Sequence, residues 1–119
     1  MEKQSKKLTN LICLSHSVKI YIPSTVDVDT PISTEEYENK TLDLLSNMFG
    51  GATIQNAYGC WNSQEKGLVK EKIKICISYC QEKQLNDNID AVVEYCEQLR
   101  DELKQEAISL EINNKLYFI

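Results

Sequence analysis

Residues 49–79, FGGATIQNAYGCWNSQEKGLVKEKIKICISY, decide the fold of this chain. Gly50 and Gly51 follow a helical pattern and supply the left-handed conformation that ends a helix. Two long runs of β-forming residues come next, 53–61 and 68–79, and a polar turn, NSQEKG, joins them. The stretch therefore predicts a helix end followed by a long antiparallel hairpin.

The second arm of this hairpin alternates between two kinds of side chain. One side carries Ile73, Ile75, Ile77 and Tyr79, and the other carries Lys70, Lys72, Lys74, Cys76 and Ser78. Successive residues of a strand point to opposite faces of a sheet. We therefore expect the isoleucines to pack against helices and the lysines to lie on the open face of the sheet.

Hydrophobic periodicity predicts the elements on either side of the hairpin. They are a strand over 18–23, a helix from about 33 to 49, a helix over 85–105, and strands over 107–112 and 116–119. This order is typical of an α+β, ferredoxin-like β-α-β-β-α-β sandwich. It has an antiparallel sheet with two helices on one face and a short C-terminal β addition. We expect one domain over 17–119 and an N-terminal arm over 1–16.

The composition narrows the class of protein. The chain has 119 residues, a net charge of −5 and five cysteines without a C-x-x-C pair. Such cysteines are typical of reduced thiols, and we expect neither a metal nor a cofactor. No apolar run is long enough to span a membrane or to form the core of a signal peptide, so we expect a cytoplasmic protein without membrane contact. The acidic balance disfavours binding to nucleic acid.

An acidic stripe is predicted on the second helix. Its members are spaced three and four residues apart and so share one helix face: Asp87, Asp90, Glu94, Glu97 and Asp101. One interpretation is a solvated helix surface. The other is a docking surface for a host protein with a basic surface.

The open sheet face offers a second set of candidates. Lys19, Tyr21, Lys72 and Lys74 are all predicted to lie there, and Trp61 stands beside the hairpin turn. Lysines and aromatic rings together can bind a nucleotide-like ligand. A partly apolar open face also favours a homodimer. The single histidine, His16, has no evident catalytic partner in the sequence.

Three short motifs carry a resemblance to a known family. They are Phe49-Gly50-Gly51-Ala52-Thr53, Gly59-Cys60-Trp61 and Gly67-Leu68-Val69-Lys70-Glu71. The run that contains them resembles a domain family of unknown function found in small bacterial, phage and plasmid proteins. The resemblance implies an α+β sandwich similar to the dimeric α+β barrels, and it supplies no catalytic residues.

These observations lead to three hypotheses on function. The first is a non-enzymatic binding module from a phage or plasmid, which inhibits a host defence component through the acidic stripe. The alternative is a protein that binds or sequesters a nucleotide signal in a pocket at a homodimer interface, with Lys19, Tyr21, Trp61, Lys72 and Lys74 as ligand-binding residues. The third is an enzyme of the dimeric-barrel kind that uses His16 or Tyr21.

Overall fold

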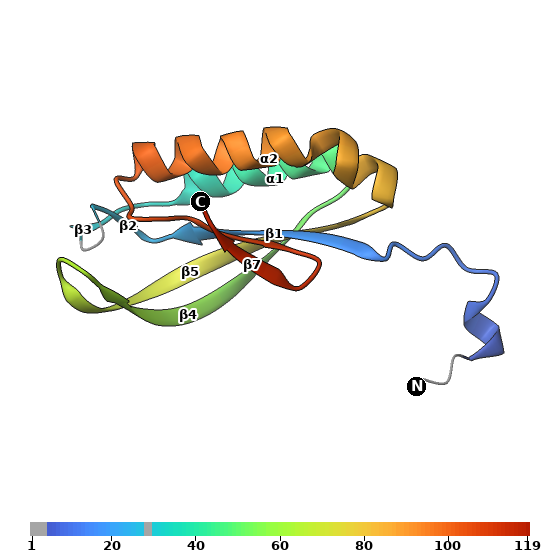
Figure 1. Ribbon diagram of the computed structural model, residues 1–119, viewed down its shortest axis with the longest axis horizontal. Helices are drawn as coiled ribbons and strands as arrows, with labels where there is room; N and C mark the ends of the chain where they lie inside the picture. Colours follow the sequence, from blue (N-terminus) through green and yellow to red (C-terminus); the bar gives the residue numbers. More distant parts are fainter. Residues whose placement is uncertain (1–4, 28–29) are drawn as a thin grey trace.

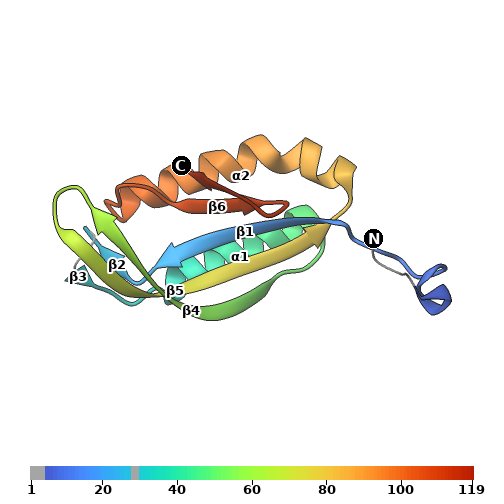
Figure 2. The same cartoon turned by 60° about the horizontal axis from the view of Figure 1, so that its bottom comes forward.

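A computed structural model describes residues 5–27 and 30–119 as one layer of helices on one antiparallel sheet. Figures 1 and 2 show both helices on the same side of the sheet, and residues 5–15 lead away from it. The elements are η1 (Lys6–Leu8), β1 (His16–Pro23), β2 (Thr25–Val26), β3 (Thr30–Pro31), α1 (Glu35–Phe49), β4 (Thr53–Ser63), β5 (Gly67–Cys80), α2 (Glu82–Glu102), β6 (Ser109–Ile112) and β7 (Lys115–Phe118).

The main sheet has five antiparallel strands in the order β4-β5-β1-β6-β7. The predicted hairpin is confirmed as β4 and β5, and it is longer than expected because pairing continues to Ser63 and Gly67. The strand β1 pairs with β5 on one side and β6 on the other, which places it at the centre. The short pair β2–β3 forms a second sheet that the sequence analysis did not predict.

Both predicted helices are present, with shifted ends. Acidic residues in the first turn of α1 interact favourably with the helix dipole, and Gly50 ends the helix at φ 93° with its amide bonded to Ser46. The helix α2 begins three residues earlier than predicted, because Gln81 and Gln84 exchange side-chain hydrogen bonds in a capping box. Among the described residues, no helix is both long enough and apolar enough to cross a membrane.

The core lies between the helices and one face of the sheet. The predicted inward side of β1 is confirmed, since Val18, Ile20 and Ile22 are almost fully buried. They meet Leu45 of α1 and Val92, Cys96 and Leu99 of α2 in one cluster. A polar pair, Thr41 with Tyr95, borders this cluster, and the two hydroxyl oxygens are 2.7 Å apart.

The prediction for the two faces of β5 is wrong. Cys76 and Ser78 are buried on the helix side, and Ile75 and Ile77 are only half-buried on the open side. The register explains this, because buried Ile20 pairs with Cys76, whereas Lys19 pairs with Ile77. Small side chains under α1 allow close packing, and the Ser78 hydroxyl donates to the carbonyl of Gly51 at 2.7 Å. A shift of one residue in a strand exchanges both faces at once.

Candidate functional site

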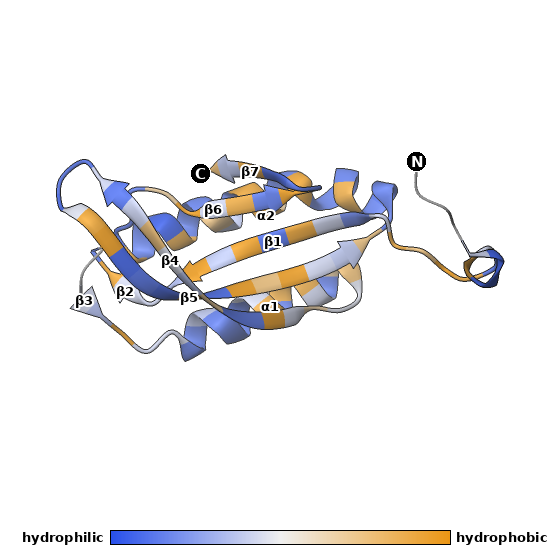
Figure 3. Cartoon of the chain, turned by 90° about the horizontal axis from the view of Figure 1, so that it is seen from below, coloured by the Kyte–Doolittle hydropathy of each residue, from blue (hydrophilic) through white to orange (hydrophobic). Residues whose placement is uncertain are grey.

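A cavity of about 770 Å³ lies on the open side of the sheet. Its walls come from β1, the β4–β5 hairpin, the segment that follows α2, and β7. Figure 3 looks onto this side and shows β1, β5 and β4 lying in front of the helices. Apolar and aromatic side chains dominate the walls: Tyr21, Trp61, Ile73, Ile108, Leu116 and Phe118. We refer to it as the open-face cavity.

Glu71 is the main ionisable group in this wall. It belongs to the open side of β5, in phase with Ile73 and Ile75, and it is half-buried. The Thr25 hydroxyl donates to Glu71 Oε2 at 3.2 Å, and the Ser24 backbone and the Trp61 side chain add further hydrogen bonds. Burial raises the pKa of Glu71, and these hydrogen bonds lower it by less.

The charge of the cavity is one-sided. Glu71 and Glu106 both line it, and none of the described lining residues is a lysine or an arginine. The Ser63 hydroxyl donates to Glu106 Oε1, which ties the hairpin turn to the segment after α2. A largely apolar cavity with carboxylates and aromatic faces is suited to a cationic organic ligand.

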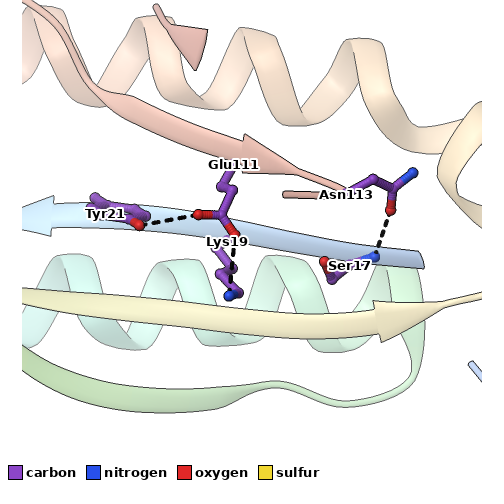
Figure 4. A network of polar contacts seen from close by, with 5 residues as sticks. All are labelled: Ser17, Lys19, Tyr21, Glu111 and Asn113. Carbon is purple, nitrogen blue, oxygen red and sulfur yellow. Dashed lines mark hydrogen bonds and ion pairs between the residues drawn. The ribbon is translucent and has the colours of Figure 1, made fainter. Parts of the chain in front are cut away.

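Figure 4 shows a polar network on β1 and β6. One of its members, Tyr21, also lines the cavity. Lys19 Nζ lies 3.1 Å from Glu111 Oε2, and the Tyr21 hydroxyl donates to Glu111 Oε1 at 3.4 Å. The hydrogen bond with Glu111 raises the pKa of Lys19, and burial raises that of Tyr21. The network holds the Tyr21 ring at the edge of the cavity in its neutral form.

The structure separates the five predicted ligand-binding residues. Tyr21 and Trp61 line the open-face cavity, and Lys19 lies beside it. Lys72 and Lys74 instead line a second cavity of about 650 Å³, together with Thr34, which precedes α1, and Tyr58. Lys74 Nζ lies 3.8 Å from Glu38 of α1. The five residues therefore do not form one site. The side chains of Lys72 and Lys74 lie on the same face of β5 as buried Cys76, opposite to the face that carries Glu71 and Ile73.

The predicted acidic stripe is exposed on α2. All five members, Asp87, Asp90, Glu94, Glu97 and Asp101, are solvent-accessible. Lys83 pairs with Asp87 at 2.6 Å and Arg100 with Asp101 at 3.0 Å. Both pairs lie in solvent, where such contacts contribute little to stability.

Apart from Cys60, which lines the open-face cavity, the histidine and the cysteines lie outside it. His16 begins β1, and its Nδ1 is 2.9 Å from Asn113 Nδ2. Among the cysteines, Cys76, Cys80 and Cys96 are buried, whereas Cys13 and Cys60 are exposed. Within the described ranges, His, Cys, Asp and Glu side chains form no group of three or more that suits a metal ion.

Glu71, Thr25 and Phe118 are not among the site residues predicted from the sequence. One signal was available for Glu71: it is an acid in phase with Ile73, Ile75 and Ile77 of a β-strand. An acid among apolar neighbours on one face is unusual unless that face holds a polar partner or ligand. Thr25 and Phe118 are brought to the site by tertiary structure, and their sequence neighbourhood gives no such signal.

Comparison with known proteins gives a match only to solved structures. No family model matches the chain, and no curated protein does. A phage SAM lyase in complex with S-methyl-5'-thioadenosine matches with a TM-score of 0.68 over 94% of both chains, at 20% identity. A phage SAM lyase in the apo state matches with a TM-score of 0.60 over 88% of both chains, at 18% identity. At these identities the match establishes a shared fold.

This match contradicts the leading functional hypothesis. The solved proteins that share the fold over nearly their whole length are enzymes. The interpretation of the chain as a non-enzymatic inhibitor acting through its acidic stripe is therefore wrong, and so is the alternative of a protein that only binds or sequesters a ligand. The resemblance to a domain family of unknown function stays a prediction.

Proposed function

We propose that the chain is a lyase that cleaves S-adenosylmethionine in the open-face cavity. The observation that carries this proposal is the half-buried carboxylate of Glu71 beside Trp61, in a fold shared with phage SAM lyase. Likeness of fold alone does not establish activity. The proposal therefore depends on how well the cavity suits this substrate and this reaction.

The size of the cavity suits the substrate. Sites for small molecules usually have volumes of roughly 300–1,000 Å³, and the open-face cavity measures about 770 Å³. The rings of Trp61, Tyr21 and Phe118 offer flat surfaces for an adenine base. The amide groups of Asn62 and Gln105 are available for the polar edge of a nucleoside.

The charge of the cavity also suits the substrate. S-adenosylmethionine carries a sulfonium and an ammonium group, and both are attracted by a carboxylate and by aromatic faces. Glu71 is the group that we assign to this cation, because burial strengthens its attraction to an opposite charge. Its ionised form is the one that binds.

The reaction breaks the bond between the sulfonium sulfur and the γ-carbon of the methionyl group. Both electrons of that bond go to sulfur, which leaves as the neutral thioether of 5'-methylthioadenosine. Within the same molecule, the α-carboxylate oxygen can reach the γ-carbon and close a lactone ring. Atoms and charge then balance without water, metal or a transferred proton. The protein contributes by holding the substrate in the geometry for this attack and by limiting the access of water.

The test is to incubate the purified chain with S-adenosylmethionine and separate the products by liquid chromatography and mass spectrometry. We expect one 5'-methylthioadenosine for each substrate lost. We expect Glu71→Gln to lower kcat/KM by about tenfold to a hundredfold, which is the value of a hydrogen bond or ion contact to a charged group. The matched control is Glu97→Gln on the exposed face of α2.

Three outcomes would overturn the proposal. The first is the absence of product, and the second is full activity of Glu71→Gln. The third is the appearance of S-adenosylhomocysteine, which would mean that the chain transfers the methyl group instead of cleaving the methionyl group.

We also propose the finer assignments of fold and origin. Taking β1, β4, β5 and β6 as the four strands of β-α-β-β-α-β, their order β4-β5-β1-β6 supports a ferredoxin-like domain with β7 as the added strand. The match to phage proteins supports an origin in a phage or another mobile element. In such a setting, removal of S-adenosylmethionine would deprive host enzymes of their methyl donor.

A further inference from the structure

The segment Ser24–Asp27 follows β1, lies beside Glu71 and is held by hydrogen bonds from several directions. The Asp27 amide donates to the carbonyl of Leu103 at 2.8 Å, and Gln105 Nε2 donates to the carbonyl of Thr25 at 2.9 Å. Lys66 Nζ donates to the carbonyl of Asp27 at 3.0 Å. These bonds join the segment to the chain after α2 and to the β4–β5 turn. We call it the strap.

Thr25 is the strap residue that reaches the proposed site. Its side chain is buried, with 8% of the residue exposed, and its hydroxyl donates to Glu71 Oε2 at 3.2 Å. The carbonyl of the same residue is held by Gln105. A donor whose own backbone is fixed in this way restrains the torsion angles of the carboxylate that it binds.

We infer that Thr25 is a positioning residue, whose hydroxyl holds the Glu71 carboxylate in one orientation. This inference rests on the proposed function where it concerns catalysis, because Glu71 is the residue assigned to the substrate cation. Thr25 itself is not expected to touch the reacting atoms. Its contribution passes through Glu71.

The surroundings of Glu71 make the Thr25 hydroxyl important. The other titratable residues that line the cavity are Tyr21 from β1, Cys60 from β4 and Glu106 from the segment after α2. Charged groups near the strap are Asp27 and Lys66, and Lys66 donates to a backbone carbonyl there. The groups that stabilise the Glu71 carboxylate are therefore neutral donors: Thr25, Ser24 and Trp61. Loss of one of these donors removes a hydrogen bond that favours the ionised form of Glu71.

The experiment uses Thr25→Val, which removes the hydroxyl at nearly constant shape, and Thr25→Ser, which keeps it. The first measurement is a pH titration of the Glu71 side chain. NMR of the full chain with labelled glutamate monitors the chemical shift of its carboxyl carbon. The signal is assigned by its absence from Glu71→Gln. The second measurement is kcat/KM for cleavage of S-adenosylmethionine.

We expect Thr25→Val to move the titration midpoint of Glu71 upward and to lower kcat/KM by about tenfold, the effect of one hydrogen bond to a charged group. Thr25→Ser should restore both values to near those of the unaltered chain. Circular dichroism checks that both variants fold.

The two proposals fail in different ways. An unchanged midpoint in Thr25→Val overturns the role of Thr25, whatever the activity. A shifted midpoint with unchanged kcat/KM also overturns it as a positioning residue for the reaction. A shifted midpoint in a chain that makes no 5'-methylthioadenosine overturns the lyase proposal and supports the action of Thr25 on Glu71.

Discussion

The hydroxyl of Thr25 and the carboxylate of Glu71 are hydrogen-bonded at 3.2 Å, although 46 residues separate them in the sequence. This contact joins the strap to the open side of β5, and it places an acidic group in a wall of isoleucine and aromatic rings. The wall raises the pKa of Glu71, and the neutral donors oppose that effect. The carboxylate is thus kept in a poorly hydrated place without a cation from the protein among the described lining residues.

The first prediction concerns the pH dependence of activity. In the proposed reaction Glu71 must be ionised to attract the substrate cation, and its pKa is raised from the ordinary value of 4.5. Therefore kcat/KM for S-adenosylmethionine should be constant at neutral pH and fall as the pH is lowered through the pKa of Glu71. Inhibition by neutral 5'-methylthioadenosine is the matched control, and its inhibition constant should change little over the same range. An equal loss for both ligands would contradict the assignment of Glu71 to the cation.

The second prediction concerns stability. A raised carboxyl pKa means that the folded chain binds a proton more tightly than the unfolded chain. The stability from this group is therefore full below 4.5 and is lost as the pH rises through the folded pKa. We expect Glu71→Gln to be more stable than the unaltered chain at neutral pH, with the difference disappearing in acid. Urea unfolding at a series of pH values measures it. A variant that is less stable at neutral pH would contradict the raised pKa.

The third prediction separates the two aromatic residues of β4. Trp61 lines the open-face cavity, whereas Tyr58 lines the cavity on the helix side. Trp61→Ala should weaken the affinity for substrate by roughly tenfold, the worth of a ring against a desolvated cation. Tyr58→Ala, on the same strand and 69% exposed, is the control and should leave the affinity unchanged. Equal effects of both variants would mean that the open-face cavity is not the binding site.

The elements of the fold could be predicted because periodicity and helix ends are local properties. Gly50 and Gly51 mark the end of α1, and the alternation over β1 identifies its buried face correctly. The pairing of strands is not local, so the extra sheet of β2 and β3 was not expected. The strap, which contains β2, is held by hydrogen bonds to Leu103 and Gln105, far along the chain.

The faces of β5 show where hydrophobicity misleads. Ile73, Ile75 and Ile77 are more apolar than Cys76 and Ser78, yet the thiol and the hydroxyl are the groups buried under α1. A thiol behaves as a small apolar group, and the Ser78 hydroxyl is satisfied by Gly51. On the opposite face of β5, Ile73 forms part of the cavity wall. The sequence-based prediction assigned the two faces of β5 the wrong way round. It therefore included Lys72 and Lys74 among the ligand-binding residues and omitted Glu71.

The fourth prediction tests these faces through the thiols. Burial raises the pKa of Cys76 and of Cys96 to about 12, and it also raises that of Cys80. A thiol reacts as the thiolate, so these three should react slowly with an aromatic disulfide reagent in the folded chain. The exposed Cys13 and Cys60 should react fast, and all five should react in denaturant. The double variant Cys13→Ser with Cys60→Ser should have no fast phase. A fast thiol in that variant would mean that the core between β5 and α2 is open to solvent.

The fifth prediction returns to the glycine pair that separates α1 from β4. Gly50 has φ +93°, in the left-handed region, whereas Gly51 lies outside it, and a Cβ at either position meets no atom within 4 Å. A methyl side chain therefore fits at both positions, and the two positions differ only in backbone conformation. Gly50→Ala should lower the free energy of unfolding by about 1 kcal/mol, because an L side chain is strained there. Gly51→Ala should be neutral or slightly stabilising, since it restricts the unfolded chain without strain. Denaturant midpoints at unchanged slope measure both, and equal losses in the two variants would contradict a left-handed helix end at Gly50.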